Sequence, residues 1–212
     1  IDIIFSDNKV PLIKNRYKQS EILDLILKGG YPRLCQIEDQ YDRNEWINSY
    51  INTILQRDIK NLANIEGLTE IPNILAILSE RIGNLINFND ISRIAKLNQM
   101  TLKRYYSLLQ MVFLIIELPA WYSNREKRLT KTSKIYLSDT ALACYLRQIS
   151  KENILNNRNY LGALLENFVV MELKKQISFN RIYVNMYHFR TDTGIEVDIC
   201  LLYTSPSPRD AT

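Results

Sequence analysis

Residues 87–109 read NFNDISRIAKLNQMTLKRYYSLL, and this stretch has the pattern of two short helices joined by a tight turn. Asn89 can cap the first helix and Asn98 the second, because an asparagine side chain accepts a hydrogen bond from the free backbone amides at a helix start. The apolar positions at helical spacing are Ile91, Ile94 and Ala95 in the first helix and Leu102, Tyr105, Leu108 and Leu109 in the second. The stretch therefore predicts a helix-turn-helix.

Two short apolar segments follow, Phe113–Leu118 and Lys134–Leu137, which we expect to form the strands of a wing. If this winged unit binds DNA, its second helix would face the groove and the basic loop Arg125–Lys134 would meet phosphates. The residues expected to contact nucleic acid are Gln99, Lys103 and Arg104 on the helix and Lys127, Arg128 and Lys131 in the loop. A winged helix that only packs against or regulates a neighbouring domain is an equal alternative, because lysine and arginine on a solvent face are ordinary.

The segment before this unit is predicted to be helical. Caps and apolar spacing indicate three helices, over Ser20–Lys28, Asp42–Ala63 and Glu70–Ile82. Gly29 and Gly30 would end the first helix, and Pro32 would stiffen the turn that follows. In the second helix, Arg57 and Asp58 suit either an ion pair or a nucleotide-sensing arginine, and the ion pair is the more ordinary interpretation.

Three carboxylates near the C-terminus have the features of a metal site. Glu166 projects from an otherwise apolar helix face, where a carboxylate needs a compensating cation. In the strand after Gly194, Glu196 and Asp198 alternate with apolar residues, which puts them on one face about 7 Å apart. Mg²⁺ takes oxygen ligands of this kind and could activate water against a phosphodiester. The alternative is that these acids bind no metal and lie in water, on an exposed strand and near a helix start. This alternative explains Glu196 well and Glu166 poorly.

A series of short motifs runs along the chain: Gly29-Gly30-Tyr31-Pro32, Tyr50–Ile59, Leu97–Thr101, Pro119–Trp121, Asn124, Lys127-Arg128, Lys134–Asp139, Gly162–Asn167, Arg190-Thr191 and Glu196–Asp198. Their order resembles a widespread prokaryotic family of AAA-type ATP-binding proteins of uncharacterised function. In that family a P-loop ATPase core precedes a helical lid, a winged helix and a C-terminal domain similar to PD-(D/E)XK nucleases. This sequence contains neither a Gly-x-x-x-x-Gly-Lys-Ser/Thr motif nor the downstream Glu-x-Lys strand.

The resemblance implies an ATP cofactor in the full-length protein and a Mg²⁺ ion at the acids. The implied site residues are an adenine-facing turn of Gly29, Gly30, Tyr31 and Pro32, and the catalytic acids Glu166, Asp198 and Glu196, the first two as metal ligands. The residues themselves predict only a tight turn that ends the helix and binds no ligand. That interpretation stays the alternative to an adenine-facing turn. Because the phosphate loop and the Glu-x-Lys strand are missing, we expect this chain alone neither to hydrolyse ATP nor to cleave DNA.

Composition sets further limits. The 212 residues carry a net charge of +4, so global attraction for nucleic acid is weak, and no apolar run approaches the roughly 18 residues of a membrane span. Cys35 and Cys144 have no histidine partners, which favours a reducing cytoplasm. The segment from Cys200 back-translates to a sequencing-library adapter, so we expect the genuine protein to end at about Ile199, and Ile1 to be a fragment end as well.

We therefore expect an α+β, mainly α fragment of a cytoplasmic protein. Its predicted parts are a helical lid portion over 1–69, a winged helix-turn-helix over 70–140, the start of an α/β restriction-endonuclease-like domain over 141–199, and an adapter-derived tail over 200–212. The predicted function is a DNA-associated ATPase with a metal-dependent nuclease module, able to form oligomers at full length. The alternative is a non-enzymatic DNA-binding or regulatory module whose nuclease-like domain serves for interaction. His188, the single histidine, is expected to be structural.

Overall fold

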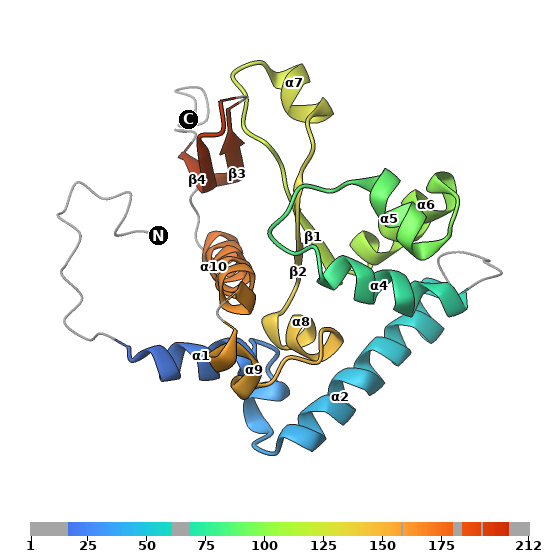
Figure 1. Cartoon of the computed structure of the whole chain (residues 1–212), viewed down its shortest axis with the longest axis vertical. Coiled ribbons are helices and arrows are strands. Elements are labelled where there is room, and N and C mark those ends of the chain that lie inside the picture. Colours follow the sequence, from blue (N-terminus) through green and yellow to red (C-terminus); the bar gives the residue numbers. More distant parts are fainter. Residues whose placement is uncertain (1–16, 61–67, 158, 180–183, 192, 204–212) are drawn as a thin grey trace, which may run out of the picture.

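The computed structural model describes residues 17–60, 68–157, 159–179, 184–191 and 193–203 (Figure 1). Within them the fold is α+β and mainly helical with two small antiparallel sheets, which confirms the expected class. The first elements are α1 (Gln19–Lys28), η1 (Leu34–Gln36), α2 (Gln40–Thr53), η2 (Ile54–Ile59), η3 (Leu68–Glu70), α4 (Ile71–Ser79), α5 (Phe88–Ala95) and α6 (Gln99–Met111). The remaining elements are β1 (Ile115–Leu118), α7 (Arg125–Thr130), β2 (Lys134–Leu137), α8 (Thr140–Leu146), α9 (Lys151–Asn156), α10 (Asn159–Phe179), β3 (Val184–Arg190) and β4 (Glu196–Tyr203). No helix of these described residues has the length and apolarity needed to cross a bilayer.

The first predicted helix is observed as α1. It begins after Lys18, whose backbone N–H donates to Glu21 Oε2 at 2.7 Å, so the cap assigned to Ser20 is wrong. The Glu21 carboxylate in the first turn therefore accepts a hydrogen bond from a backbone amide at the helix start. Its negative charge there is also favoured by the helix dipole. Gly29 ends α1 with a φ of 69°, a conformation that glycine adopts without steric cost.

The second predicted helix is observed as α2 continued by η2, a π-helical turn. Arg57 and Asp58 are exposed on η2, and neither forms an ion pair with another described residue. Arg57 and Asp58 do not pair with each other, because neighbouring helical residues point in different directions. An ion pair of either residue with the rest of the chain stays a prediction. The third predicted helix is α4, which ends at Ser79 rather than Ile82.

Helices α5 and α6 are the two helices predicted from residues 87–109. Asn98 caps α6 as predicted, by accepting from a backbone amide at 2.7 Å. The cap of α5 is Asn87, which accepts at 3.1 Å, so the assignment to Asn89 is wrong. Starting the helix at Asn87 places Phe88 in the first turn, where its ring meets Tyr106 of α6 edge-on with centroids 5.2 Å apart. That contact stabilises the pair of helices beyond the cap itself.

The two predicted wing strands are observed as β1 and β2, which pair antiparallel. Ile115 lies opposite Leu137 and Leu118 opposite Lys134, and β1 is shorter than the predicted segment. Leu85, in the segment between α4 and α5, adds an antiparallel bridge to Lys134. All four residues of β2 are buried, including Lys134, so this charged side chain must find partners inside the fold.

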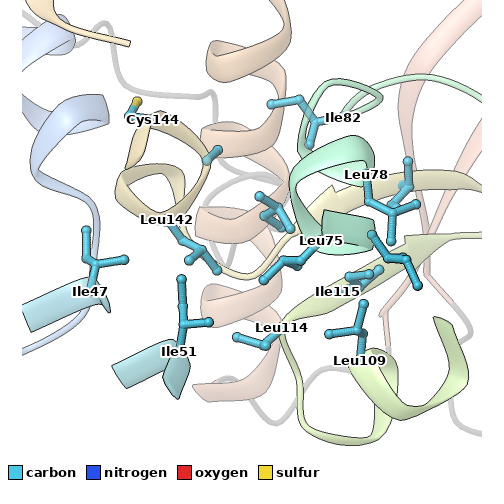
Figure 2. Close-up of a cluster of buried hydrophobic side chains, with 14 of the residues drawn as sticks. Ile47, Ile51, Leu75, Leu78, Ile82, Leu109, Leu114, Ile115, Leu142 and Cys144 are labelled. Carbon is cyan, nitrogen blue, oxygen red and sulfur yellow. The ribbon is translucent and has the colours of Figure 1, made fainter. Parts of the chain in front are cut away.

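A hydrophobic core joins the predicted lid, winged and nuclease-like parts. Figure 2 shows Ile51 of α2, Leu75 of α4, Leu109 of α6 and Leu142 of α8 converging on it, and each is at most 6% exposed. Full burial of such a side chain contributes about 1.5–3 kcal/mol. Helices from all three predicted parts are therefore held around common apolar contacts. The predicted part boundaries themselves stay predictions.

Strands β3 and β4 form an antiparallel hairpin that is attached to the segment after β1. His188 of β3 makes a parallel bridge with Ala120: its N–H donates to Pro119 O at 2.9 Å and its carbonyl accepts from Trp121 N at 2.7 Å. The ring of His188 is buried, with Nε2 3.1 Å from Thr132 O. These contacts fit the structural role expected of this histidine.

Strand β4 continues beyond the predicted end of the genuine protein. Its last four residues, Cys200–Tyr203, pair with β3, from Tyr187 opposite Cys200 to Val184 opposite Tyr203. Residues 204–212 lie outside the described residues. The adapter origin of the tail stays a prediction.

Candidate functional site

Lys134 lies among three carboxylates that come from two other elements. Its Nζ is 3.1 Å from Glu166 Oε1 on α10, 2.8 Å from Glu196 Oε1 and 2.8 Å from Asp198 Oδ1, the last two on β4. We call these four residues the acid–lysine cluster. The structure thus brings the three predicted catalytic acids together. The expectation that Lys134 meets phosphates with the rest of its loop is wrong, because its side chain is only 3% exposed.

Helix α10 is fixed to β2 by the residue after Glu166. The Asn167 side chain accepts from Leu137 N at 2.9 Å and donates to Leu137 O at 3.0 Å, and all of these atoms are buried. Beside it, Tyr136 donates its hydroxyl to Glu166 Oε1 at 2.5 Å. Gly83, at a φ of 77°, leaves room for this carboxylate, since a Cβ there would lie 3.3 Å from Glu166 Oε2. Glu166 is therefore held in place by backbone-anchored neighbours.

Strand β4 supplies the other two acids as the sequence pattern predicted. Glu196 and Asp198 are two residues apart, so both point to the face of the hairpin that meets Lys134. Arg190, opposite Glu196 on β3, brings a guanidinium nitrogen to 3.8 Å from Glu196 Oε2. Asp198 has 58% of its side chain exposed, so the cluster is closed on the lysine side and open to water at Asp198.

The charges in the cluster favour a permanently protonated lysine. Burial alone would lower the pKa of Lys134, but hydrogen bonds to Asp198, Glu196 and Glu166 outweigh it and raise this pKa. Burial, with the hydrogen bond to Glu166 next, raises the pKa of Tyr136, so its phenol is a neutral donor. A lysine in this state is a cation and a hydrogen-bond donor, and it cannot act as a general base.

A magnesium ion does not fit the cluster as it is arranged. Among the described residues there is no group of three or more His, Cys, Asp or Glu side chains placed to hold a metal. The ammonium of Lys134 already lies where the oxygens of Glu166, Glu196 and Asp198 converge. The assignment of Glu166 and Asp198 as metal ligands stays a prediction.

Two members of this site were missed by reasoning from the sequence. Lys134 and Tyr136 lie two residues apart on β2 and both contact Glu166. The available signal was a lysine at the start of a strand whose other residues are apolar or aromatic, which in a buried strand requires a partner. Its partners lie 32 and 64 residues away in the sequence, so local patterns could not identify them.

The predicted nucleotide turn packs against the start of α8. Gly30 N donates to Asp139 Oδ2 at 2.7 Å, and the other oxygen of Asp139 caps α8. Burial raises the pKa of Asp139, while the hydrogen bond from Gly30 opposes this shift. The ring of Tyr31 lies tilted against the rings of Trp46 and Tyr50, and its hydroxyl is 3.0 Å from Ser138 Oγ. These contacts give Gly29, Gly30 and Tyr31 a structural role, and Pro32 is exposed beside them.

The predicted nucleic-acid residues divide into separate groups. Gln99 and Lys103 on α6 line a groove of about 570 Å³ together with Thr132. Lys131 lines an adjoining groove of about 330 Å³ that also contains Arg190. The two share Leu85 and Thr132, and we call them together the wing groove.

Three other candidates lie outside the wing groove. Arg104 is exposed on α6 but lines neither half of it. Arg128 is engaged inside the protein: its guanidinium lies over the rings of Trp121 and Tyr187 at 6.0 and 5.7 Å and donates to the carbonyl of Tyr122. The side chain of Lys127 lies outside the described residues. Lys103 and Lys131 also each lie over one ring, that of Phe88 at 5.5 Å and that of Tyr122 at 5.1 Å, but Arg128 lies over two rings and adds the hydrogen bond to a backbone carbonyl.

A further cavity of about 660 Å³ lies between α1, α2, α8 and α9. An ion pair of 2.5 Å between Lys151 and Asp24 spans its edge, and Arg43 donates to Leu27 O at 3.2 Å. Cys144 lines it, and burial raises the pKa of this thiol to about 12, so it is not a reactive thiolate. None of the predicted site residues lines this cavity.

Comparisons with known proteins place the chain among uncharacterized relatives. The uncharacterized proteins Mb2031c of Mycobacterium bovis and Rv2008c of Mycobacterium tuberculosis are each 29% identical over 175 residues, which is 82% of this chain and 39% of theirs. The uncharacterized protein MJ1544 of Methanocaldococcus jannaschii is 25% identical over 198 residues, 85% of this chain and 42% of its own. The chain thus spans about two fifths of the length of these relatives. No solved structure matches.

Two families of conserved domains match consecutive parts of the sequence. Residues 161–207, which contain the three acids of the cluster, match the family described as Domain of unknown function (DUF4143). Residues 19–153, more than half of the chain, match the family described as Domain of unknown function (DUF8612). The chain therefore belongs to the DUF8612 family.

Proposed function

We propose that the chain is a nucleic-acid-binding module of an ATP-binding AAA-type protein, and that its nuclease-like C-terminal part serves for interaction rather than cleavage. The observation that carries this proposal is the wing groove, where Gln99 and Lys103 of α6 and Lys131 beside β2 lie along one continuous surface. Cationic side chains along such a surface favour the phosphate backbone of nucleic acid.

The element order supports a winged helix as the binding unit. Helix α4 is followed by the bridge at Leu85, the helices α5 and α6, and the strands β1 and β2. A helix, a short strand, two helices and two strands is the order of a winged helix, in which the last helix of the pair is the recognition helix. On α6, Gln99, Lys103 and Arg104 are all exposed and available to nucleic acid.

ATP as the cofactor of the full-length protein rests on the resemblance and on relatives. DUF4143 is found in proteins associated with AAA ATPases, and the curated relatives are more than twice as long as this chain. In such a protein Gly29 to Pro32 would face the adenine ring while docked on Asp139. An oligomeric full-length form and a cytoplasmic location stay predictions.

Metal-dependent cleavage of nucleic acid is the second candidate. The convergence of Glu166, Glu196 and Asp198 on one point favours it. It requires Mg²⁺ to bind beside or in place of Lys134. In the full-length protein, Asp198→Asn and Glu166→Gln, which keep a hydrogen-bond acceptor for Lys134, would then each abolish Mg²⁺-dependent cleavage. Cleavage that persists in the double variant would exclude this site as the nuclease centre.

Binding of a fluorescein-labelled duplex, followed by anisotropy at low salt, tests the first candidate. We expect Lys103→Ala with Lys131→Ala to weaken the affinity of the chain about tenfold or more, because two phosphate contacts are lost. Lys18→Ala is the matched control, since Lys18 precedes α1, across the molecule from α6 (Figure 1). Equal losses in the double variant and the control would show that binding does not use the wing groove.

A further inference from the structure

The acid–lysine cluster satisfies the hydrogen-bonding capacity of Lys134 in full. An ammonium group has three N–H donors, and three carboxylate oxygens, one from each acid, lie within 3.1 Å of its nitrogen. These are the lengths of charge-assisted hydrogen bonds. Bonds from carboxylate oxygen to a divalent metal are shorter, about 2.0–2.6 Å. The acids are therefore arranged around a nitrogen atom, at the spacing an ammonium requires.

Lys134 and the three acids each depend on the charge of the other. A buried ammonium without partners would be strongly unfavourable, so Lys134 needs the acids. The acids in turn need a cation, because three carboxylates that converge on one point repel one another. Among the described residues, the other cation near them is Arg190, the cross-strand partner of Glu196, with a guanidinium nitrogen 3.8 Å from Glu196 Oε2. Lys134 is thus the only described cation that contacts all three acids.

We propose that Lys134 is the resident cation of a latent divalent-metal site: its ammonium occupies the position that a metal ion would take among Glu166, Glu196 and Asp198, and so keeps the site free of metal. The lysine comes from the wing strand, whereas the acids come from α10 and β4. The cluster then acts as a clasp between the wing and the C-terminal hairpin. This inference does not depend on nucleic-acid binding and holds if the wing groove proves inert.

Removal of the ammonium should convert the clasp into a metal site. In Lys134→Met the aliphatic stem is largely retained, so the buried strand keeps its packing, while the three carboxylates lose their compensating charge. A divalent cation supplies that charge and takes oxygen ligands. Asp198 is open to water, which gives the ion a path of entry and room for water ligands.

Titration with Mn²⁺ alone, followed by electron paramagnetic resonance of free and bound ion, tests the proposal. We expect the wild-type chain to have no one-to-one site tighter than about 1 mM, and Lys134→Met to bind one Mn²⁺ about tenfold tighter or more. Adding Asp198→Asn to Lys134→Met should remove that site. Lys18→Met, which changes an exposed lysine just before α1, is the matched control and should give the wild-type Mn²⁺ titration.

Two results would overturn the proposal. One is a folded Lys134→Met chain, verified by circular dichroism, that gains no Mn²⁺ site. The other is a one-to-one Mn²⁺ site in the wild-type chain that Asp198→Asn removes, which would mean that metal and lysine share the cluster. If Lys134→Met does not fold, the wild-type titration decides alone: no one-to-one site supports the proposal, and an Asp198-dependent site refutes it. Loss of DNA binding in the wing-groove variants would leave each of these outcomes unchanged.

Discussion

Asn167 holds the backbone of Leu137 with both ends of its side-chain amide, through hydrogen bonds of 2.9 and 3.0 Å between buried atoms. A side-chain amide that pairs with a strand in this way continues the hydrogen bonding along the edge of β2 beyond the bridge between Leu85 and Lys134. It also fixes the rotation of α10, and with it the position of Glu166 against Lys134 and Tyr136. The helix and strand β2 are therefore aligned by contacts that do not involve the acidic side chains or the lysine.

Replacement of Asn167 should be costly for stability. Asn167→Ala leaves the N–H and C=O of Leu137 buried without partners, and we expect it to lower the free energy of unfolding by about 2–4 kcal/mol. Urea denaturation followed by circular dichroism measures this change. Asn185→Ala, at an exposed position of β3, is the control and should change little. A loss below about 0.5 kcal/mol for Asn167→Ala would contradict the anchoring role.

Glycine substitutions should have opposite effects at two positions. Gly29 has a φ of 69°, and a Cβ there would lie 2.0 Å from Asp139 Oδ1, so Gly29→Ala should destabilise the chain by more than about 2 kcal/mol. Gly162 lies inside α10 with nothing within 4 Å of a Cβ, so Gly162→Ala should stabilise it by about 0.5–1 kcal/mol. Thermal denaturation of the two variants would show shifts of opposite sign. Equal shifts would mean that the docking of the Gly29 turn on Asp139 is not formed.

Acidification should destabilise the fold through His188. Burial lowers the pKa of His188, and its Nδ1 is buried without a partner among the described residues, so the folded state holds the neutral ring. The unfolded chain binds the proton more readily, and the contribution of His188 is therefore complete above its ordinary pKa and lost as the pH falls below about 6.5. We expect His188→Gln to reduce the slope of unfolding free energy against pH between about 6.5 and 5. An unchanged slope would show that His188 is not what makes the fold sensitive there.

Arg128 should contribute to the stability of the fold rather than to nucleic-acid binding. Its guanidinium lies over Trp121 and Tyr187 and donates to a backbone carbonyl, so Arg128→Ala should lower the unfolding free energy by about 1–2 kcal/mol. Its affinity for duplex DNA, measured on the folded fraction, should fall less than that of Lys131→Ala. If Arg128→Ala loses more DNA affinity than Lys131→Ala, Arg128 binds phosphate and this prediction is wrong.

Local patterns in the sequence were sufficient to predict the helices and strands between residues 87 and 137. The cap at Asn98 and the apolar spacing of α6 lie within a few residues of each other, and both are observed. The start of α5 was misjudged because Asn87 and Asn89 are equally good caps, and the choice depends on Phe88 packing against Tyr106, 18 positions further on. Contacts of that kind are tertiary and are not encoded in a local pattern.

The acids of the candidate site were predictable, but their cation was not. Alternation in β4 correctly placed Glu196 and Asp198 on one face, and the apolar face of α10 correctly implied that Glu166 needs a compensating charge. A metal ion was the natural expectation, because the sequence offers no lysine near Glu166. Lys134 reaches it only through the pairing of β2 with α10, which the Asn167 side chain sets up.

The central claim, that the wing groove binds nucleic acid through its lysines, is tested most directly by the salt dependence of duplex affinity. We predict that the logarithm of the association constant of the wild-type chain falls linearly with the logarithm of salt concentration. In Lys103→Ala with Lys131→Ala, the magnitude of that slope should be smaller by about 2, since each lost phosphate contact removes about 0.9, and Lys18→Ala should leave it unchanged. Absence of duplex binding by the wild-type chain at low salt, or an identical slope in the double variant, would contradict the claim.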